Sequence, residues 1–231
     1  MTIMELLYRG KTKDVYRLDD ERALLRFKDD VTGVDGVFDP GANSVALSID
    51  GMGRANLAMS ARYFKLLEEG GVRTHFIDAD QEAGTMTVRM ARPFGRGLEV
   101  ICRRRAVGSF IRRYGTYIEP GAPLDDYVEF TLKDDERGDP LITREGLAAL
   151  DILSGDQYEL IAARTRETTG LIADDLALLG LELYDIKLEF GVAGGEVLLM
   201  DEVSAGNMRV MEDGRQVEPM DLSRRVTEGR S

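Results

Sequence analysis

The chain has few of the residues on which protein chemistry most often depends. Its 231 residues include one cysteine, Cys102, one histidine, His75, and no tryptophan. A single cysteine excludes an intrachain disulfide framework and a zinc site built from several cysteines. A single histidine leaves little room for a Ser-His-Asp or Cys-His mechanism. Because both residues lie in apolar, strand-like runs, we expect an ordinary packed or surface histidine and an inert core thiol.

Positive charge and long apolar runs are also scarce. The 30 Lys and Arg residues stand against 42 Asp and Glu residues, a net charge of −12. This excess of acid argues against a general nucleic-acid binder and against a polybasic membrane-surface protein. No apolar run approaches the ~20 residues of a membrane span, and the N-terminus lacks a signal-like stretch. We therefore expect a soluble, cytoplasmic protein with a core, since 43% of the residues are hydrophobic.

The spacing of apolar residues predicts an α+β fold in two lobes. Strand-like runs occur at 6–8, 14–18, 23–27, 85–91, 98–103, 127–133, 181–190 and 197–203. Helical spacing occurs at 57–67 and 157–179. Pro93 and two glycines interrupt the pattern, so we expect an N-terminal lobe at 1–92 and a C-terminal lobe at 93–231. The polar tail from Glu212 onward is expected to be loosely ordered.

Lys11 and Lys13 flank a threonine in the segment YRGKTK at 8–13. Alternate side chains of an extended segment share a face, so the two ammonium groups project together. They repel one another unless an anion or acids lie between them. A polyphosphate fits that requirement, although the spacing is not that of a P-loop. The alternative is a solvated strand edge protected by lysines.

Six arginines lie between residues 96 and 113, with Glu99 as the single acid among them. The planar fork of arginine suits phosphate and carboxylate groups. Gly108 and Ser109, directly before a predicted helix, could add backbone N–H groups and a hydroxyl to an anion site. The alternative is that the arginines pair with the eight acids found between residues 119 and 139.

The segment YDIKLEFG at 184–191 alternates strictly and places Lys187 and Glu189 on its charged face. A glycine-containing turn then returns the chain in a second strand that ends near Asp201 and Glu202. A hairpin that brings Glu189 to one acid of that pair would suit Mg²⁺, which takes one or two carboxylates beside phosphates and water. The sequence does not fix the register that selects the acid. The alternative is an amphipathic strand with a solvated charged face.

Six segments in this order resemble the SAICAR synthetase family of purine biosynthesis. They are YRGKTKDVY at 8–16, RFKDD at 26–30, LLEEGGVRTHF at 66–76, EVICRRRAVGSFIRRYG at 99–115, EFTLKDDERGDP at 129–140, and YDIKLEFG with GEVLLMDEVS at 184–204. Any one segment alone is a weak signal, whereas six in register are specific. The resemblance runs from about Leu6 to Arg225.

The resemblance implies a two-lobed α+β fold related to ATP-grasp enzymes, with antiparallel sheets, flanking helices and an ATP cleft between the lobes. It implies an ATP-dependent ligase that activates the carboxylate of a carboxyaminoimidazole ribonucleotide as an acyl phosphate. The amine of L-aspartate then displaces phosphate to form an amide. The implied cofactors are ATP and Mg²⁺. The implied partners are small substrates, with no nucleic acid and no membrane, and a homo-oligomer is compatible with the sequence.

The same resemblance assigns roles to particular residues. It places ATP at Lys11, Lys13, Lys133 and Glu99, catalysis at Lys187 and Asp139, the ribonucleotide 5′-phosphate at Arg103, Ser109 and Arg209, and Mg²⁺ at Glu189 and Asp201.

The chain also departs from the family pattern. The family's Lys-Gly-x-x-Asn-Asn begins with Met52 and ends with Leu57, and its His-Asp-Pro begins with Gly138. Its Ser-Pro-Asp becomes Ser-Ala-Gly at 204–206, a tryptophan becomes Met211, and the closing C-terminal helix is expected to be missing. These changes leave two alternatives open. One is a paralogue in specialised metabolism that couples a different azole carboxylate or amine; the other is a non-catalytic nucleotide-binding protein.

Overall fold

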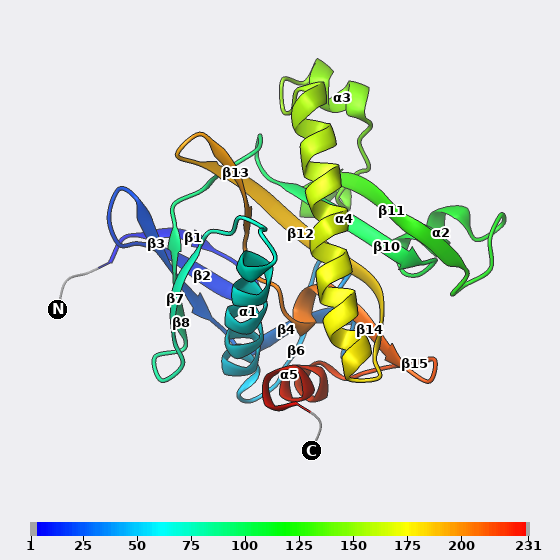
Figure 1. The fold of residues 1–231 in the computed structure, drawn as a ribbon, viewed down its shortest axis with the longest axis horizontal. Helices are drawn as coiled ribbons and strands as arrows, with labels where there is room; N and C mark the ends of the chain where they lie inside the picture. Colours follow the sequence, from blue (N-terminus) through cyan, green and yellow to red (C-terminus); the bar gives the residue numbers. More distant parts are fainter. Residues whose placement is uncertain (1–3, 230–231) are drawn as a thin grey trace.

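The computed structural model describes residues 4–229 and has the α+β architecture that the sequence predicts (Figure 1). The strands are β1 (Leu6–Arg9), β2 (Lys13–Arg17), β3 (Arg22–Phe27), β4 (Asp30–Val34), β5 (Val37–Phe38), β6 (Val45–Ser48), β7 (Phe76–Asp80), β8 (Thr85–Arg89), β9 (Arg92–Pro93), β10 (Leu98–Arg105), β11 (Pro123–Leu132), β12 (Glu182–Ala193), β13 (Glu196–Met200), β14 (Met208–Glu212) and β15 (Arg215–Gln216). The helices are α1 (Met52–Glu69), α2 (Ser109–Tyr114), α3 (Arg144–Ala149), α4 (Gly155–Leu178) and α5 (Pro219–Glu228), with 3-10 turns η1 (Asp135–Arg137) and η2 (Ala205–Asn207).

The strands form antiparallel sheets, as expected for this class. The N-terminal part of the chain supplies a five-stranded sheet in the order β1-β2-β3-β8-β7. The C-terminal part supplies a seven-stranded sheet in which β11, β10, β12, β14 and β15 follow one another, while β9 and β13 also pair with β12. A small sheet of β5, β4 and β6 completes the described part of the chain.

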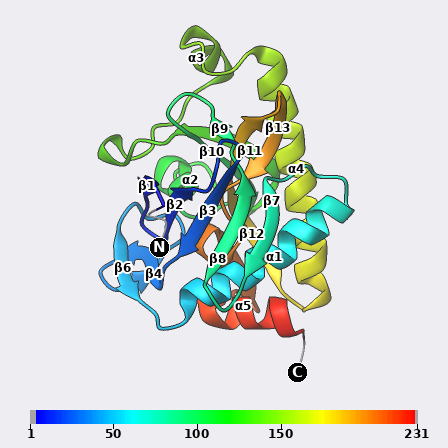
Figure 2. The same cartoon turned by 90° about the vertical axis from the view of Figure 1, so that its left-hand side faces the viewer.

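Two long helices cover these sheets on the side that Figure 1 shows. Helix α1 packs against β3, β7 and β8 and buries Leu57, Phe64 and Leu67. Helix α4 crosses β10, β11 and β12 and also touches α1, so a continuous core runs under both helices (Figures 1 and 2). Ser154 and Gln157 cap the start of α4 by exchanging side-chain and backbone hydrogen bonds. With this face covered, the opposite side of the seven-stranded sheet is left for a binding site.

A short main-chain seam joins the five-stranded sheet to β13 of the seven-stranded sheet. Thr74 and Leu199 form a parallel bridge. The N–H of His75 donates to the carbonyl of Leu199 at 2.9 Å, and the N–H of Leu199 donates to the carbonyl of Arg73 at 2.9 Å. The two sheets are therefore connected by backbone hydrogen bonds as well as by the chain itself.

The C-terminal segment is ordered, contrary to both expectations made for it. Beyond Glu212 the chain forms β15 and then α5, which packs on α1 and buries Leu222 and Val226. A closing helix is thus present. Pro219 at its first turn and Gly229 after its last residue are ordinary helix boundaries, but three apolar residues, Met220, Leu222 and Val226, gave too weak a periodic signal. The outer ends of the two predicted lobes, 1–3 and 230–231, lie outside the described residues.

The single cysteine is packed, as predicted, and the single histidine is packed rather than at the surface, the first of the two positions expected for it. His75 is 3% exposed and Cys102 is fully buried. Burial disfavours the charged form of each group. It therefore raises the pKa of the Cys102 thiol to about 11 and lowers the pKa of His75 to about 4. Neither group therefore titrates near neutral pH. Among the described helices, none is long and apolar enough to cross a membrane.

Candidate active site

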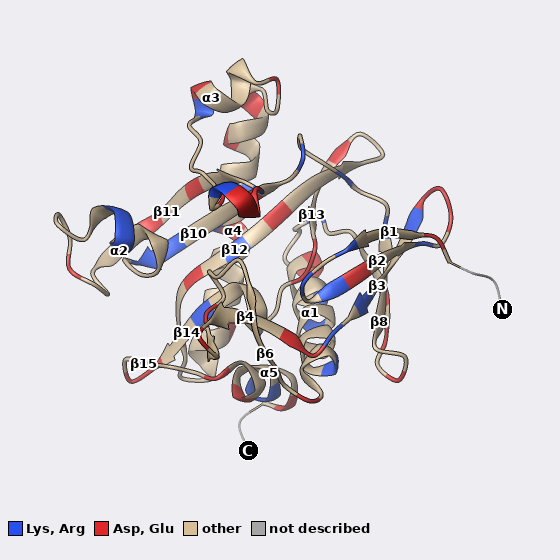
Figure 3. Ribbon diagram, turned by 180° about the vertical axis from the view of Figure 1, so that it is seen from behind, with Lys and Arg blue, Asp and Glu red and all other residues tan. Residues whose placement is uncertain are grey.

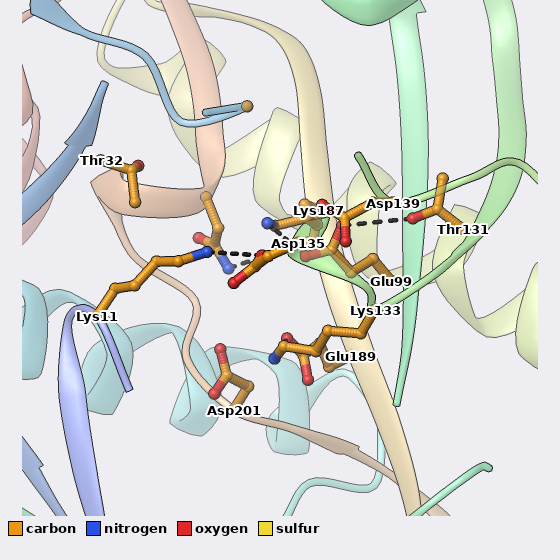
Figure 4. Close-up of polar contacts among 12 residues, drawn as sticks. Lys11, Thr32, Glu99, Thr131, Lys133, Asp135, Asp139, Lys187, Glu189 and Asp201 are labelled. Atoms are coloured by element: carbon orange, nitrogen blue, oxygen red, sulfur yellow. Dashed lines mark hydrogen bonds and ion pairs between the residues drawn. The ribbon is translucent and has the colours of Figure 1, made fainter. Parts of the chain in front are cut away.

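The β12–β13 hairpin places two carboxylates beside each other. Glu189 pairs with Met200 in the register, so simple alternation would direct the next side chain, Asp201, to the opposite face. Asp201 instead has a left-handed backbone with φ of 72°, which interrupts the alternation. Figure 4 shows its carboxylate beside Glu189. Asp201, rather than Glu202, is the acid of the pair whose charge acts on Glu189.

Two lysines neutralise these carboxylates. The Nζ of Lys133 lies 2.5 Å from Oε1 of Glu189, and the Nζ of Lys13 lies 3.1 Å from Oδ2 of Asp201. Lys13 begins β2 in the five-stranded sheet, whereas the other three residues belong to the opposite half of the molecule. We call Lys13, Lys133, Glu189 and Asp201 the ion cluster. It lies where the two halves meet.

Burial and charge act in opposite directions within the ion cluster. Burial raises the pKa of Glu189, and the neighbouring Asp201 raises it further, against the effect of Lys133. Burial would raise the pKa of Asp201 too, but Lys13 and Lys133 outweigh it and lower that pKa. Burial would lower the pKa of each lysine, yet the carboxylates outweigh it and raise both. The cluster therefore holds charged lysines that could exchange their internal partners for a phosphate.

Lys11 and Lys13 pair with separate acids from the opposite half of the molecule. The Nζ of Lys11 lies 2.7 Å from Oδ1 of Asp135 in η1, and both side chains are partly exposed. The side chain of Lys13 is only 9% exposed and also contacts Glu202 at 2.6 Å. Lys13 is thus no solvated strand-edge lysine. Both lysines reach toward the junction of the two halves.

A cavity of about 480 Å³ opens on the face that α1 and α4 leave uncovered. It is lined by six of the residues predicted for the site: Glu99, Arg103, Ser109, Asp139, Lys187 and Arg209. Figure 3 shows acids and bases side by side along β10, β11 and β12 on this face. A larger hollow of about 920 Å³, between the β2–β3 turn and the β12–β13 turn, contains none of the predicted residues. The smaller cavity is therefore the candidate active site, because it contains the predicted residues and the larger one does not.

Arg103, Ser109 and Arg209 meet at one end of this cavity. The Nη1 of Arg103 and the Nη1 of Arg209 donate to Oδ2 of Asp185 at 2.6 and 2.7 Å. The Nη2 of Arg103 donates to Oγ of Ser109 at 2.8 Å. Asp185 is 3% exposed, so two guanidinium groups are held in fixed positions by one buried carboxylate. A dianionic phosphate would fit between them and the hydroxyl.

Two glycines allow Arg209 to reach this position. A Cβ on Gly108, whose φ is 56°, would lie 2.8 Å from both terminal nitrogens of Arg209. A Cβ on Gly41 would lie 2.6 Å from Nη2 of the same side chain. Any larger residue at either position would displace the guanidinium. Close approach to Arg209 therefore explains the need for glycine here.

Lys187 and Asp139 line the middle of the cavity. The Nζ of Lys187 lies 2.7 Å from Oε1 of Glu99, on the neighbouring strand β10. Burial alone would lower the pKa of Lys187, but Glu99 outweighs it and raises that pKa. The carboxylate of Asp139 accepts a hydrogen bond from the N–H of Asp134 at 2.7 Å. Figure 4 shows Lys187, Asp139 and Glu99 in one group.

The pairing predicted as the alternative for the arginines also occurs. Arg113 lies 2.6 Å from Glu129, and Arg104 lies 3.2 Å from Asp126. Arg103 contacts Glu129 as well, at 2.7 Å. The alternative pairing is therefore confirmed for Arg103, Arg104 and Arg113, whereas phosphate binding by Arg103 stays a prediction.

Two of the departures from the family pattern lie away from the cavity. Met52 and Leu57 are fully buried in α1, so neither side chain lines the cavity. Gly138 does line the cavity, and Asn207 lines it just after the altered Ser-Ala-Gly segment. The side chain of Asn207 is occupied, since it donates to the carbonyls of Lys187 and Glu202.

Three acids that contact the predicted residues were not among the residues that the resemblance assigns to the site. Asp185 holds two arginines, Glu129 holds Arg103 from β11, and Glu202 contacts Lys13. The strict alternation of β12 placed Asp185 on the charged face, which was the available signal. Glu129 was one of the eight acids expected as arginine partners, and Glu202 was the alternative to Asp201 for the metal, but neither pattern identified Arg103 or Lys13 as the partner.

Comparison with known proteins shows the family to which the chain belongs. Residues 6–224 match SAICAR synthetase. The chain belongs to the SAICAR synthetase family. It is 53% identical over 227 residues to the phosphoribosylaminoimidazole-succinocarboxamide synthase of Clostridium tetani (strain Massachusetts / E88), covering 97% of this chain and all of that protein. It is 38% identical to the synthase of the same name from Caldivirga maquilingensis, covering 93% of this chain and 85% of that protein.

Solved SAICAR synthetases share the fold. One structure, in complex with ADP, is 29% identical with a TM-score of 0.84 and covers 96% of this chain and 97% of its own. The SAICAR synthetase from Pyrococcus horikoshii OT3 is 28% identical with a TM-score of 0.82, over 94% of this chain and 98% of its own. The α+β fold with antiparallel sheets is therefore the SAICAR synthetase fold, and the chain spans nearly the whole of these relatives.

The donor set of the ion cluster fits the metal that this family's chemistry implies. Among residues 4–229, no group of three or more His, Cys, Asp or Glu side chains could hold a metal by itself. Glu189 and Asp201 supply two adjacent carboxylates, and Mg²⁺ commonly takes that number and completes its shell with phosphates and water. The arrangement therefore suits a Mg²⁺ ion that arrives with a nucleotide better than a permanently bound one.

Proposed function

We propose that this protein is the ATP-dependent carbon–nitrogen ligase of purine biosynthesis that makes SAICAR. It joins L-aspartate to the carboxylate of a carboxyaminoimidazole ribonucleotide. One observation carries the proposal: the ion cluster, suited to a triphosphate, lies next to a cavity with two fixed arginines at its end. Such a pair of sites is what transfer of a phosphoryl group to a phosphorylated substrate needs. Membership of the SAICAR synthetase family supports the same conclusion.

The ion cluster would bind ATP. Lys11, Lys13 and Lys133 would contact its phosphates. Glu99 would orient the ammonium group of Lys187, with which it forms an ion pair, toward the same phosphates. Glu189 and Asp201 would hold Mg²⁺, which neutralises phosphate charge as the γ-phosphoryl group moves. The positive charge of the lysines, kept at neutral pH by their carboxylate partners, serves the same purpose before and after transfer.

The cavity would bind the ribonucleotide. Arg103, Ser109 and Arg209 would hold its 5′-phosphate, and the buried carboxylate of Asp185 keeps the two guanidinium groups in place. This anchors the substrate at one end, so its carboxylate extends toward Lys187 and the ion cluster. Most of the rate enhancement would come from this positioning and from charge neutralisation.

The chemistry requires two bond exchanges. First, a carboxylate oxygen attacks the γ-phosphorus of ATP, which forms an acyl phosphate and releases ADP; Lys187 would stabilise the charge on the carboxylate. Next, the amine of L-aspartate attacks the acyl carbon and inorganic phosphate leaves with its oxygen. Asp139, in the same cavity, would accept the proton that the amine loses.

Further features of the proposal follow from the fold and the reaction. We place the boundary of the lobes at residues 92 and 93. Strand β8, which ends at Arg89, is the last strand of the five-stranded sheet along the chain, and β9 (Arg92–Pro93) already pairs with β12 of the seven-stranded sheet. Substrates of this kind are small, charged metabolites, so we also propose a cytoplasmic enzyme. We leave its assembly as a homo-oligomer to a sedimentation measurement.

The test is formation of SAICAR from ATP, Mg²⁺, L-aspartate and the carboxyaminoimidazole ribonucleotide, followed by chromatography and ADP release. Glu189→Gln should lower kcat by about 100-fold, because one metal ligand loses its charge. Glu182→Gln is the matched control, since Glu182 lies exposed on the same strand and pairs with Arg105. Turnover with a different acid or amine, but none with this pair, would assign the enzyme to another substrate. Unchanged kcat in Glu189→Gln would disprove the metal role.

The two alternatives have less support. A different azole substrate was suggested by the departures, but Met52 and Leu57 lie in the core rather than in the cavity. A non-catalytic nucleotide-binding protein would not need a cavity with two arginines held on one carboxylate. Absence of ATP binding in calorimetry would contradict the enzyme proposal directly.

A further inference from the structure

His75, the only histidine of the chain, lies next to the ion cluster, and no step proposed above uses it. Its ring is 3% exposed and packs edge-on against Phe64, with the ring centres 5.4 Å apart. Its Nε2 lies 3.1 Å from the main-chain carbonyl oxygen of Asp201. A carbonyl oxygen can only accept a hydrogen bond, so Nε2 must carry the proton in this contact.

The partner of this hydrogen bond is an unusual residue. Asp201 is the residue whose left-handed backbone, at φ of 72°, interrupts the alternation of β13 and places its carboxylate beside Glu189. Left-handed backbone is uncommon for residues other than glycine and persists where the surroundings hold it. The contact that can hold it here comes from the other half of the molecule.

The seam between the sheets fixes His75 in turn. Its N–H donates to the carbonyl of Leu199, two residues before Asp201, and its carbonyl accepts from the N–H of Arg89. His75 therefore forms hydrogen bonds to two nearby carbonyls at the end of β13: its main-chain N–H binds Leu199 and its ring binds Asp201. Lys13, from the same half of the molecule, holds the Asp201 carboxylate itself.

From these contacts we propose that His75 is a positioning residue for the metal site. Its Nε2–H holds the carbonyl of Asp201, and so fixes the left-handed turn that aims the Asp201 carboxylate at Glu189. The metal part of this inference rests on the proposed function, in which Glu189 and Asp201 hold Mg²⁺. Residues that orient metal ligands without touching the metal commonly change affinity by about 10- to 100-fold when replaced.

The first test uses the wild-type protein and does not depend on the metal. Because the chain has one histidine, ¹⁵N NMR of the ring nitrogens has a single, unambiguous pair of signals. The expected result is a protonated Nε2 whose proton exchanges slowly, as in a buried hydrogen bond. A deprotonated Nε2 at neutral pH would overturn the proposal, whatever the variants show.

The second test measures Mn²⁺ affinity by electron paramagnetic resonance, with a non-hydrolysable ATP analogue present. His75→Met removes the donor at similar volume and should weaken Mn²⁺ binding by about tenfold. His75→Gln keeps an N–H at the ε position and should restore most of the affinity. Phe76→Leu is the packing control: it removes a neighbouring buried ring that stacks on Phe64 and should leave Mn²⁺ affinity unchanged.

The outcomes separate the inference from the function on which it rests. Equal Mn²⁺ affinity in wild type and His75→Met, or equal loss in His75→Met and His75→Gln, would overturn the positioning role. A wild-type protein that binds the ATP analogue but no Mn²⁺ would overturn the metal assignment of the proposed function. If His75→Met does not fold, the NMR test and His75→Gln still decide.

Discussion

Arg103 and Arg209 come from different strands and donate to the same carboxylate oxygen, Oδ2 of Asp185, at 2.6 and 2.7 Å. Two cations this close repel one another, and the buried carboxylate between them offsets the repulsion. The two guanidinium groups are thus held in place by one buried charge. Removing the carboxylate charge should lower both the stability of the fold and the affinity for substrate.

We expect Asp185→Asn to lower kcat/KM for the ribonucleotide at least tenfold, mainly through KM, since the arginines lose their common partner. Breaking one member of a buried ion pair typically costs about 3–5 kcal/mol, so the thermal midpoint should also fall. Steady-state kinetics and a thermal melt would check both. Asp126→Asn, which alters the more exposed pair with Arg104, is the control and should change neither by much.

Glu202 and Asp135 are the acid partners of the two lysines predicted to bind phosphate, and they differ in burial. Glu202 is 5% exposed, and its Oε1 accepts from Lys13 at 2.6 Å, whereas the side chain of Asp135 is 54% exposed. Glu202→Gln should therefore raise KM for ATP and reduce the free energy of unfolding by about 3 kcal/mol. Asp135→Asn should change the free energy of unfolding by less than about 1 kcal/mol. Equal effects in urea titrations would contradict this ranking.

The pH dependence of stability should include a contribution from His75. Burial, with Lys13 and Arg89 acting in the same direction and Asp201 opposing, lowers its pKa to about 4 in the folded chain, against about 6.5 when unfolded. Below pH 6.5 the unfolded chain binds a proton that the folded chain does not. Stability is therefore full above about 6.5 and falls as the pH drops toward 4.

At pH 5 this loss should amount to about 2 kcal/mol. Urea unfolding at pH 7 and pH 5 would measure it, with His75→Gln as the comparison because glutamine does not titrate. The wild type should lose more stability than the variant between the two values. An equal loss would mean that carboxylates alone account for the acid sensitivity.

Helix α5 should contribute to stability through its packing on α1. Leu222 is 1% exposed and Ser223 contacts the sulfur of Met59 in α1 at 3.5 Å. Leu222→Ala should cost about 2–5 kcal/mol, the usual range for a buried leucine. Arg224→Ala, at an exposed position on the same helix, should be near neutral. A small effect of Leu222→Ala in denaturant unfolding would show that α5 packs loosely.

Much of the fold could be predicted because its strongest elements have periodic sequences. The alternation in β12 and the long helical repeat of α4 fall close to their expected positions. The segment from Asp30 to Ser48 was missed because its strands are short and the turns between them contain glycine, proline and aspartate, which conceal the strand pattern. Helix α5 was missed because three apolar residues suffice when a neighbouring helix supplies the rest of the core.

The candidate site divides in the same way. Sequence patterns identified the lysines, arginines and acids that meet at the cavity and in the ion cluster. They could not identify the residues that hold them, such as Asp185 and Glu202, because such contacts are set by three-dimensional pairing. Nor could they show the left-handed turn at Asp201, which decides which of two adjacent acids faces Glu189.

The seam between Thr74 and Leu199 has a mechanical consequence. Backbone hydrogen bonds there resist sliding of one sheet past the other, but a rotation about the seam would keep them intact. We therefore expect the two halves of the molecule to rotate relative to one another, with the seam as the hinge. His75 and Asp201 lie beside this hinge, so the distance between them should change little during the rotation. Lys11 and Asp135, by contrast, are joined by a partly exposed ion pair, which such a rotation could open without breaking a backbone hydrogen bond.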